Sequence, residues 1–287
     1  MSSYRGRFAP SPTGALHAGS LVAAMASYLD ARAHEGVWLV RIEDIDPPRD
    51  IPGAGEHIIR TLARLGLVSD EPVLWQHDRC GAYQTALDDL TAKGRVYGCA
   101  CSRKEAALRA AELGLPCGVY PGTCRLGTNG RPVRALRFLT RPGATTFTDR
   151  LCGTFTQDVE HEVGDFVLKR ADGLWAYQLA AIVDDIHQRV TDVVRGADLL
   201  DNTPRQIQLI RALGAPEPRY MHLPLVLNPE GQKLSKQQGA TPLDETNPLG
   251  ELERAWTHLG FARLGADTID AFWRAAIPIW KARHGQS

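Results

Sequence analysis

Apolar segments typical of β-strands alternate with helical patterns through the first third of the chain, and this order limits the folds that the chain can adopt. The strand-like segments are runs of apolar and β-branched residues, whereas apolar residues in the segments between them recur at helical spacing. We expect strands over residues 4–9, 37–42 and 73–75, and helices over 17–33, 54–65 and 82–93. This order predicts an α/β fold in which crossover helices connect the strands of a parallel sheet.

The alternation stops at Gly94, and a different pattern follows. Many Gly and Pro residues, short alternating strands and a group of cysteines occupy residues 97–165, which we interpret as an insertion. Further on, we expect a β-hairpin over 165–177, a helix from Thr203 to Gly214, and two or three small helices over 248–281. The chain is therefore expected to consist of a main domain (1–96 and 166–240), the insertion, and a short helical region (241–287).

Composition and charge exclude some classes of protein. The formal net charge is zero, which argues against tight, unspecific binding to nucleic acid because such binding rests on an excess of Lys and Arg. A specific RNA substrate held by a local basic patch stays possible. No apolar run approaches the roughly 18 residues that a membrane helix needs, and residues 1–7 are polar. We therefore expect a cytoplasmic protein that is not associated with a membrane.

Two short motifs that lie far apart in the sequence suit a nucleoside triphosphate held from both sides. Residues 7–20 read RFAPSPTGALHAGS and place His17 and Gly19 at the start of a helix, whose unpaired N–H groups and positive dipole end attract phosphate. Residues 233–237 read KLSKQ, and Lys233 and Lys236 could follow the charge that moves onto a leaving pyrophosphate. Either motif alone could be an ordinary helix start or a solvated loop.

Charged residues at the carboxyl ends of expected strands indicate a second binding site. Glu43 follows the strand 37–42, at the edge where open α/β sheets bind ligands, and its carboxylate could hold an ammonium group. Tyr177 and Arg195 are also expected at strand ends. Arginine is a natural bidentate partner of carboxylates, so Arg7 and Arg195 together could bind a substrate with two carboxylates.

Ordinary structural roles are the alternatives for some of these residues. Asp44 and Asp46, which follow Glu43, could serve as capping or turn residues. Arg195 could form an internal salt bridge with Asp185 or Asp198.

The cysteines indicate a metal site in the insertion. Four of the six cysteines fall within 26 residues, which in a cytoplasmic chain favours metal binding over disulfide bonds. Cys99 and Cys101, with Cys124 in the segment that starts at Tyr120, suggest a structural zinc site. Cys117 competes for the place of the fourth ligand. Cys80 and Cys152 are expected to be ordinary buried thiols.

In these motifs the chain resembles the class I aminoacyl-tRNA synthetases of the glutamyl type. Residues 17–20 match the HIGH motif of that family, and residues 233–237 match its KMSKS motif, from which Leu234 and Gln237 depart. Further signatures of the glutamyl branch match residues 7–14, 41–46, 165–185 and 195–199. The likeness runs from about Tyr4 to Gly239 and implies a Rossmann-like class I catalytic domain with a zinc-bearing insertion.

The resemblance is strongest to truncated paralogues of the glutamyl-tRNA synthetases. Only about 50 residues follow the lysine motif, too few for the long anticodon-binding region of the full enzymes, and the sequence Pro47-Pro48-Arg49 also resembles the paralogues. This family activates glutamate with ATP to glutamyl-adenylate. It then transfers the glutamate to the queuosine base in the anticodon of tRNA(Asp), which is a tRNA modification. The implied partners are ATP, L-glutamate and tRNA(Asp) that bears queuosine, and we expect a monomer.

The resemblance also implies roles for individual residues. ATP binding falls to His17, Gly19 and Lys236, catalysis to the same three residues together with Lys233, and ATP is expected to enter with Mg²⁺. The residues implied for glutamate are Arg7, Phe8, Ala9, Pro10, Ser11, Glu43, Tyr177 and Arg195. The ligands implied for one structural Zn²⁺ are Cys99, Cys101, Tyr120 and Cys124. The stretch between Cys101 and Tyr120 is longer than the family leads us to expect, which keeps Cys117 in consideration.

Other functions stay open at this point. The chain could be a minimal glutamyl-tRNA synthetase that charges the 3′ end, or a glutamate-activating ligase with another acceptor. A zinc-stabilised RNA-binding module without catalysis is a third possibility. The presence of His17, Gly19, Glu43 and Lys236 argues against that last function.

Overall fold

The computed structural model describes residues 4–225 and 241–285. A parallel sheet of β1 (Arg5–Phe8), β2 (Val37–Ile42) and β3 (Leu74–Trp75) follows the order β1-β2-β3. A second sheet has the order β7-β6-β10-β9, in which β9 and β6 both run parallel to β10. Its strands are β6 (Thr145–Asp149), β7 (Gly153–Gln157), β9 (Asp192–Gly196) and β10 (Arg219–Leu223).

The two sheets adjoin where β1 lies beside β9. The N–H of Thr191 donates to the carbonyl of Arg5 at 2.9 Å, and the N–H of Arg5 donates to Thr191 Oγ1 at 2.8 Å. The strand order is therefore β3-β2-β1-β9-β10-β6-β7. In doubly wound folds, ligands bind at the carboxyl ends of the strands where the order reverses, which here is the boundary between β1 and β9.

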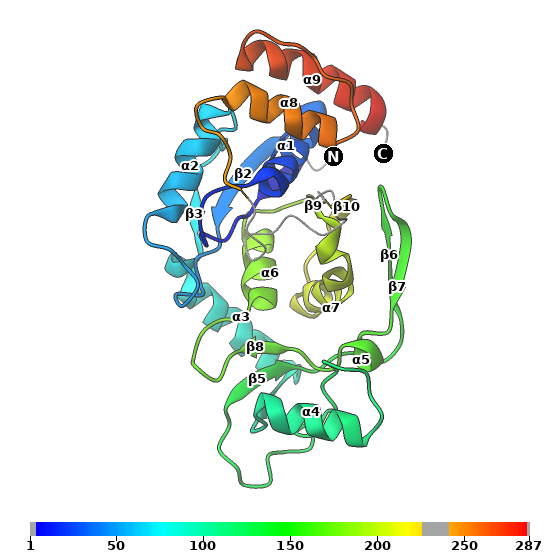
Figure 1. Ribbon diagram of the computed structural model, residues 1–287. Coiled ribbons are helices and arrows are strands. Elements are labelled where there is room, and N and C mark those ends of the chain that lie inside the picture. The colour runs from blue at the N-terminus through cyan, green and yellow to red at the C-terminus, as the bar shows by residue number, and fades with distance from the viewer. Residues whose placement is uncertain (1–3, 226–240, 286–287) are drawn as a thin grey trace.

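Helix α1 (Ala18–Ala33) forms the centre of the larger hydrophobic core. Leu21, Met25 and Leu29 are fully buried on it. The helix contacts the sheet on one side, and on the other it contacts α8 (Pro248–His258) and α9 (Ile269–His284), which lie over it in Figure 1. The expected C-terminal helices thus number two, and they cover the crossover helix of the first β-α-β unit.

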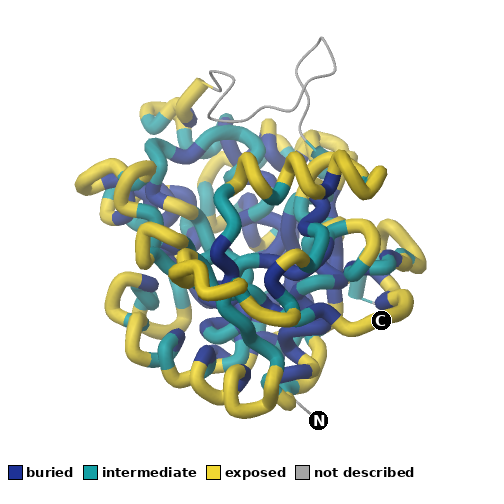
Figure 2. Tube along the Cα trace, turned by 90° about the horizontal axis from the view of Figure 1, so that it is seen from below, coloured by how far each residue is buried: buried dark blue, intermediate teal, exposed yellow. Residues whose placement is uncertain are grey.

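A second core lies among the helices on the other side of the sheet. These helices are α3 (Cys80–Ala92), α6 (Tyr177–His187) and α7 (Thr203–Leu213), while α2 (Ala54–Arg64) and the short 3₁₀ helices η1 (Gln76–Arg79) and η2 (Ala197–Asn202) complete the connections. Buried segments concentrate in the interior of the molecule, and exposed helical turns and loops surround them (Figure 2). Among the described residues, no helix has the length and the apolar character needed to cross a bilayer.

The expected insertion contains a small antiparallel sheet with the order β4-β5-β8. Its strands are β4 (Val96–Cys99), β5 (Ala135–Phe138) and β8 (Val167–Lys169), and the helices α4 (Arg103–Glu112) and α5 (Val159–Glu162) lie nearby (Figure 1). Strands β6 and β7 belong to the same range of residues but extend away from this sheet, since β6 pairs with β10 and β7 pairs with β6. The range 97–165 therefore contributes strands to two sheets.

Most expected elements are confirmed within one or two residues, but the hairpin over 165–177 is wrong in its second arm. Lys169 pairs with Trp175 in an isolated bridge, and Tyr177 is the first residue of α6 rather than the end of a strand. The physical reason lies in the residues that follow, because Leu179, Ala180 and Ile182 are buried together only on a helix packed against its neighbours.

Candidate active site and metal centre

One cavity lies at the start of α1, beside the carboxyl ends of β9 and β10. It has a volume of about 180 Å³ and is lined by His17, Gly19, Ser20, Val22, Ala23, Gly196, Asp198, Leu223, Pro224 and Leu225. His17 is the N-cap of the helix, and its Nδ1 accepts from the N–H of Ser20 at 3.4 Å. The first turn of α1 has no acidic residue, so its dipole end can attract an anion.

The lysine motif, with Lys233 and Lys236, lies outside the described residues. The described chain on both sides of that gap borders the cavity at the start of α1. Leu225 lines it, and Pro242 forms a bridge with His17.

A second cavity, of about 190 Å³, lies at the carboxyl end of β2 and the start of α6. It is lined by Ser11, Thr13, Glu43, Ile45, Asp46, Arg49, Asp50, Gln76, Arg170, Trp175, Ala176 and Tyr177. Three of the residues expected to bind glutamate thus line one cavity, namely Ser11, Glu43 and Tyr177. Phe8 is buried in the core instead, and neither it, Ala9 nor Pro10 lines this cavity, although the carbonyl of Pro10 accepts from the N–H of Glu43 at 3.0 Å.

A buried ionic network lies behind this second cavity. Arg41, which is fully buried, donates to Asp185 Oδ1 at 2.7 Å and to Glu43 Oε1 at 3.0 Å. Arg7 donates to the same Asp185 oxygen at 3.1 Å, so one carboxylate holds two guanidinium groups. Gln188 completes the network as an acceptor for Arg41 at 2.9 Å. The positions of Arg7 and Glu43 therefore depend on Arg41 and Asp185.

The network changes the pKa values of its acids in opposite directions. Burial raises the pKa of Glu43 above its usual range, although the charges of Arg41 and Arg7 oppose the rise. Burial would also raise the pKa of Asp185, but the charges of Arg7 and Arg41 outweigh it and hold that pKa below its usual range. Burial and the charge of Glu43 raise the pKa of the Tyr177 phenol. A cation placed beside Glu43 would favour its charged form.

The sequence led to no role for Arg41, and Asp185 was considered only as a possible salt-bridge partner of Arg195. One signal was present, since Arg41 and Glu43 are two residues apart along a strand and so point to the same face. Asp185 pairs with Arg7 and Arg41, and the alternative of a salt bridge between Asp185 and Arg195 is therefore wrong.

Arg195 is 6% exposed near the end of β9, and its hydrogen bonds go to other partners. Its Nε donates to His222 Nε2 at 3.0 Å, and its Nη2 donates to Thr203 Oγ1 at 2.7 Å and to the Leu199 carbonyl at 3.2 Å. His222 in turn lies 2.6 Å from Asp149, measured from Nδ1 to Oδ2. Sequence reasoning missed both His222 and Asp149.

The contacts of Asp44 and Asp46 agree with the capping and turn roles considered for them. Asp44 accepts from the N–H of His77 at 3.0 Å and also pairs with that side chain, which ties the turn after β2 to η1. The carbonyl of Asp46 accepts from the N–H of Arg49, and its carboxylate pairs with Arg49 and Arg170.

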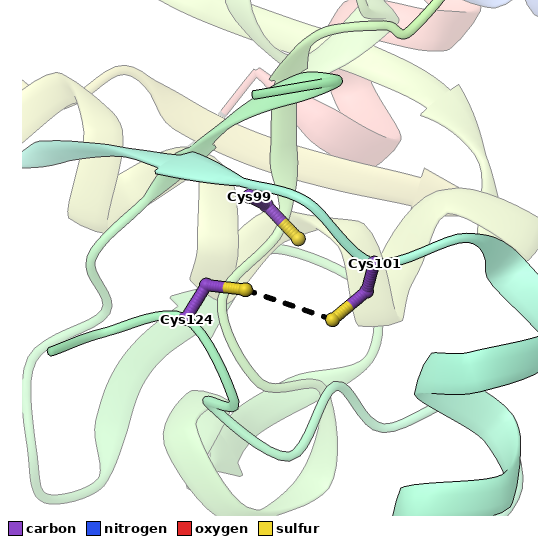
Figure 3. A group of neighbouring side chains, drawn as sticks. All are labelled: Cys99, Cys101 and Cys124. Carbon is purple, nitrogen blue, oxygen red and sulfur yellow. Dashed lines mark hydrogen bonds between the residues drawn. The ribbon is translucent and has the colours of Figure 1, made fainter. Parts of the chain in front are cut away.

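Three cysteines of the insertion form a cluster that suits a metal ion. The Sγ atoms of Cys99, Cys101 and Cys124 all lie within 4.8 Å of one another (Figure 3). The Tyr120 hydroxyl lies 3.2 Å from the Cys99 sulfur and 3.9 Å from the Cys101 sulfur. Cys117 is exposed and does not belong to the cluster.

The chemistry of this donor set fits zinc. Burial and the neighbouring Cys124 and Cys99 sulfurs raise the pKa of the Cys101 thiol to about 11. A bound divalent cation would favour the thiolates, and three thiolates with one oxygen would complete a tetrahedral site. Cys80 and Cys152, expected to be buried, are exposed instead, because one begins α3 and the other lies in the turn between β6 and β7.

Comparison with known proteins identifies the family. The model of the catalytic domain of class I tRNA synthetases (E and Q) matches residues 3–114 and 128–270. The break in the match, residues 115–127, contains Cys117, Tyr120 and Cys124.

Relatives named Glutamyl-Q tRNA(Asp) synthetase match over nearly their whole length. The protein of Burkholderia mallei (strain ATCC 23344) is 57% identical over 99% of this chain and 98% of its own length. That of Burkholderia cenocepacia (strain HI2424) is 56% identical over 98% of this chain and 97% of its own length.

A solved structure of a longer protein agrees with this assignment. The glutamate tRNA ligase of Elizabethkingia meningosepticum, crystallised in complex with its amino acid, superposes with a TM-score of 0.72 at 30% identity. The match covers 83% of this chain, which spans about half (53%) of that ligase. The chain therefore belongs to the glutamyl- and glutaminyl-type class I tRNA synthetase family and, within it, to the glutamyl-Q tRNA(Asp) synthetases.

Proposed function

We propose that the protein activates L-glutamate with ATP and transfers the glutamate to the queuosine base of tRNA(Asp). The observation that carries the activation step is the pair of cavities along the carboxyl edge of the sheet. One cavity lies at the anion-attracting start of α1, and the other contains Glu43 and adjoins buried arginines. The acceptor rests on the relatives of similar length that bear that name.

Glutamate suits the charges around the second cavity. Arg7 and Arg195, which are 5% and 6% exposed, do not line the cavity themselves, but their charges act on Tyr177, which does. These two arginines would bind the two carboxylates of glutamate, and Glu43 would bind its ammonium group. The hydroxyls of Ser11 and Tyr177 line the cavity and can contribute hydrogen bonds. Phe8, Ala9 and Pro10 would contribute to this site through their backbone, which positions the residues around them.

Adenylate formation needs positioning more than acid–base catalysis. The α-carboxylate of glutamate attacks the α-phosphorus of ATP in line, an O–P bond forms, and pyrophosphate leaves. No general base is needed because the carboxylate is already ionised. His17, Gly19 and the N–H groups of α1 would stabilise the phosphates, while Mg²⁺ bound with ATP would supply positive charge. We assign Lys233 and Lys236 to the leaving pyrophosphate on the sequence motif alone.

Lys236→Ala is expected to lower glutamate-dependent ATP–pyrophosphate exchange by roughly 100-fold, which is the usual effect of removing one charged or hydrogen-bonding group that stabilises a transition state. Glutamate binding, measured by protection against thermal unfolding, should change little. Lys281→Ala, which removes an exposed lysine from α9, is the matched control and should keep wild-type exchange. Wild-type exchange in Lys236→Ala would show that the assignment is wrong.

We infer that one zinc ion cross-links the insertion through Cys99, Cys101, Cys124 and Tyr120. Cys99→Ser should lose the metal, as measured by elemental analysis, and should lower the melting temperature. Tyr120→Phe should weaken zinc binding, whereas Cys117→Ser should retain one equivalent because Cys117 is exposed. Full zinc in Cys99→Ser would exclude the site. Loss of zinc in Cys117→Ser would show that Cys117, and not Tyr120, is the fourth ligand.

We also propose a domain organisation for the chain. Residues 1–96 and 166–240 would form the catalytic domain, 97–165 the zinc-bearing insertion, and 241–287 a short helical region. Since residues from this one chain surround both cavities, we propose that the protein acts as a monomer.

The acceptor can be located directly. The enzyme is incubated with ATP, labelled glutamate and tRNA that contains queuosine, and the RNA is digested to nucleosides. Label on the queuosine nucleoside is the expected result. Label on the 3′-terminal adenosine would instead indicate a minimal glutamyl-tRNA synthetase. Intact pyrophosphate exchange without labelled RNA would indicate a different acceptor, and absence of exchange would contradict glutamate activation itself.

A further inference from the structure

We propose that His222 and Asp149 are positioning residues that fix the Arg195 guanidinium for glutamate recognition. The inference rests on the proposed role of Arg195 as a carboxylate ligand. His222 lies directly beside Arg195 in the register of β10 with β9, and Asp149 ends β6 on the other side of β10. Three neighbouring strands therefore supply a chain of three side chains that runs across the sheet.

The chain of hydrogen bonds dictates one tautomer of His222. The Nε–H of an arginine can only donate, so His222 Nε2, 3.0 Å away, must accept. The ring proton then lies on Nδ1 and is donated to Asp149 Oδ2 at 2.6 Å. A protonated ring would place two N–H groups against each other, at Nε2 of His222 and Nε of Arg195.

The surroundings keep the His222 ring neutral and the Asp149 carboxylate ionised. The His222 side chain is fully buried, and burial lowers its pKa despite the hydrogen bond to Asp149, so the ring is neutral near pH 7. The other groups around it are the rings of Phe147 and Tyr220 and the hydroxyl of Thr203. Burial would raise the pKa of Asp149, but His222 and three backbone N–H groups lower it to about 2, so Asp149 stays ionised.

The hydrogen bonds of Arg195 leave its Nη1 available for a substrate carboxylate. Nε is bonded to His222, and Nη2 is bonded to Thr203 and the Leu199 carbonyl. Among the described residues, no hydrogen-bond partner occurs for Nη1. Two fixed nitrogens define the plane of a guanidinium, so substrate binding would not have to order this side chain. A pre-positioned donor of this kind increases affinity for a carboxylate without taking part in the chemistry.

Asp149→Asn tests the tautomer while it preserves the shape of the side chain. The asparagine Oδ1 can still accept from the N–H groups of Leu151 and Cys152, whereas its amide would donate to His222 Nδ1. The ring proton would then move to Nε2, where it would face the Nε–H donor of Arg195 and break that hydrogen bond. We expect KM for glutamate to rise roughly 10- to 100-fold, the range for removal of a hydrogen bond to a charged group, with KM for ATP unchanged.

Two substitutions of His222 separate positioning from a merely structural role. His222→Gln places an acceptor near the position of Nε2 and should keep KM for glutamate within about threefold of wild type. His222→Asn keeps a donor toward Asp149 but has no group that reaches Arg195, so KM should rise as in Asp149→Asn. Melting temperatures of the two variants control for damage to the fold, since both replace the same buried ring with an amide.

The outcomes distinguish this inference from the proposed function. Arg195→Ala should raise KM for glutamate strongly. An unchanged KM in that variant would show that Arg195 does not bind a carboxylate of glutamate. If Arg195→Ala raises KM but Asp149→Asn does not, Arg195 binds glutamate without help from His222, and the inference is overturned. Equal KM values in His222→Gln and His222→Asn would also overturn it.

Discussion

Arg41→Met is expected to lower the free energy of unfolding by about 3–5 kcal/mol, the cost of breaking a buried ion pair on one side. Arg41 is fully buried and holds both Glu43 and Asp185, so methionine would leave the Glu43 carboxylate buried without its partner. KM for glutamate should rise roughly tenfold or more, because the group proposed to bind its ammonium loses its fixed position. Urea unfolding and pyrophosphate exchange measure the two effects.

The pH dependence of this variant has a defined sign. Burial raises the pKa of Glu43, and Arg41 is the main opposing charge. Its removal should raise that pKa further, so the pH below which KM for glutamate increases should move upward. A carboxyl whose pKa is higher in the folded than in the unfolded state destabilises the fold as the pH rises between the two values. The stability deficit of Arg41→Met should therefore grow from acid toward neutral pH.

Arg64→Met is the matched control for this experiment. Arg64 also forms an ion pair, with Glu245 at 2.8 Å, but its side chain is 62% exposed. Exposed pairs contribute little, so this variant should change stability by less than about 1 kcal/mol and leave the pH profile of KM unchanged. Equal losses of stability in the two variants would contradict the role given to the buried network.

Local patterns explain why much of the fold could be predicted from the sequence. The strand 37–42 was predicted with its observed bounds because its apolar run is bounded by Gly36 and by the turn that starts at Asp44. The end of α7 was also correct, since Gly214 adopts the left-handed conformation that ends a helix. The candidate site followed from the same logic, because strand ends and helix starts can be read from short segments.

Features that depend on pairing between distant segments could not be read in this way. Asp149 and His222 are 73 residues apart, and only the parallel pairing of β6 with β10 brings them together. Tyr177 was assigned to a strand because the Asp172-Gly173 turn favours a hairpin, but burial of the residues after it required a helix. Arg41 was passed over because a buried arginine has a clear role only once its carboxylate partners are known.

The end of β6 connects the candidate site to the rest of the fold through adjacent residues. Asp149 contacts His222, whereas Arg150 pairs with Asp30, which is fully buried near the end of α1. Asp30 also accepts from Tyr4 at 2.6 Å and from Trp280 of α9 at 3.1 Å. One carboxylate therefore joins the N-terminal strand region, α1, the β6–β7 turn and the C-terminal helix.

Asp30→Ala should lower the free energy of unfolding by about 3–5 kcal/mol, because it removes the closest carboxylate of the partly buried Arg150 guanidinium and leaves two buried donors without their acceptor. Within the part of the chain that the structure describes, Arg150 would keep only the His284 carbonyl, at 2.9 Å, and Asp192, at 4.0 Å. Activity per folded molecule should be retained. Asp30 lies 13 residues after the helix cap His17, which is about 20 Å along α1 at 1.5 Å per residue. Urea unfolding, with KM for ATP and glutamate measured at low temperature, tests both statements. Glu112→Ala, which removes an exposed partner of Arg109, is the control and should cost less than about 1 kcal/mol.

The stability difference between wild type and Asp30→Ala should depend on pH. Burial would raise the pKa of Asp30, but the hydrogen bond and charge of Arg150 outweigh it and lower the pKa below its usual range. A lowered pKa contributes stability that is present above the unfolded value of about 3.9 and is lost as the pH falls through the folded value. The difference should therefore be constant from neutral pH to about pH 5 and shrink below about pH 4. A difference that persists unchanged into strong acid would mean that packing around Asp30, and not its charge, holds these four elements together.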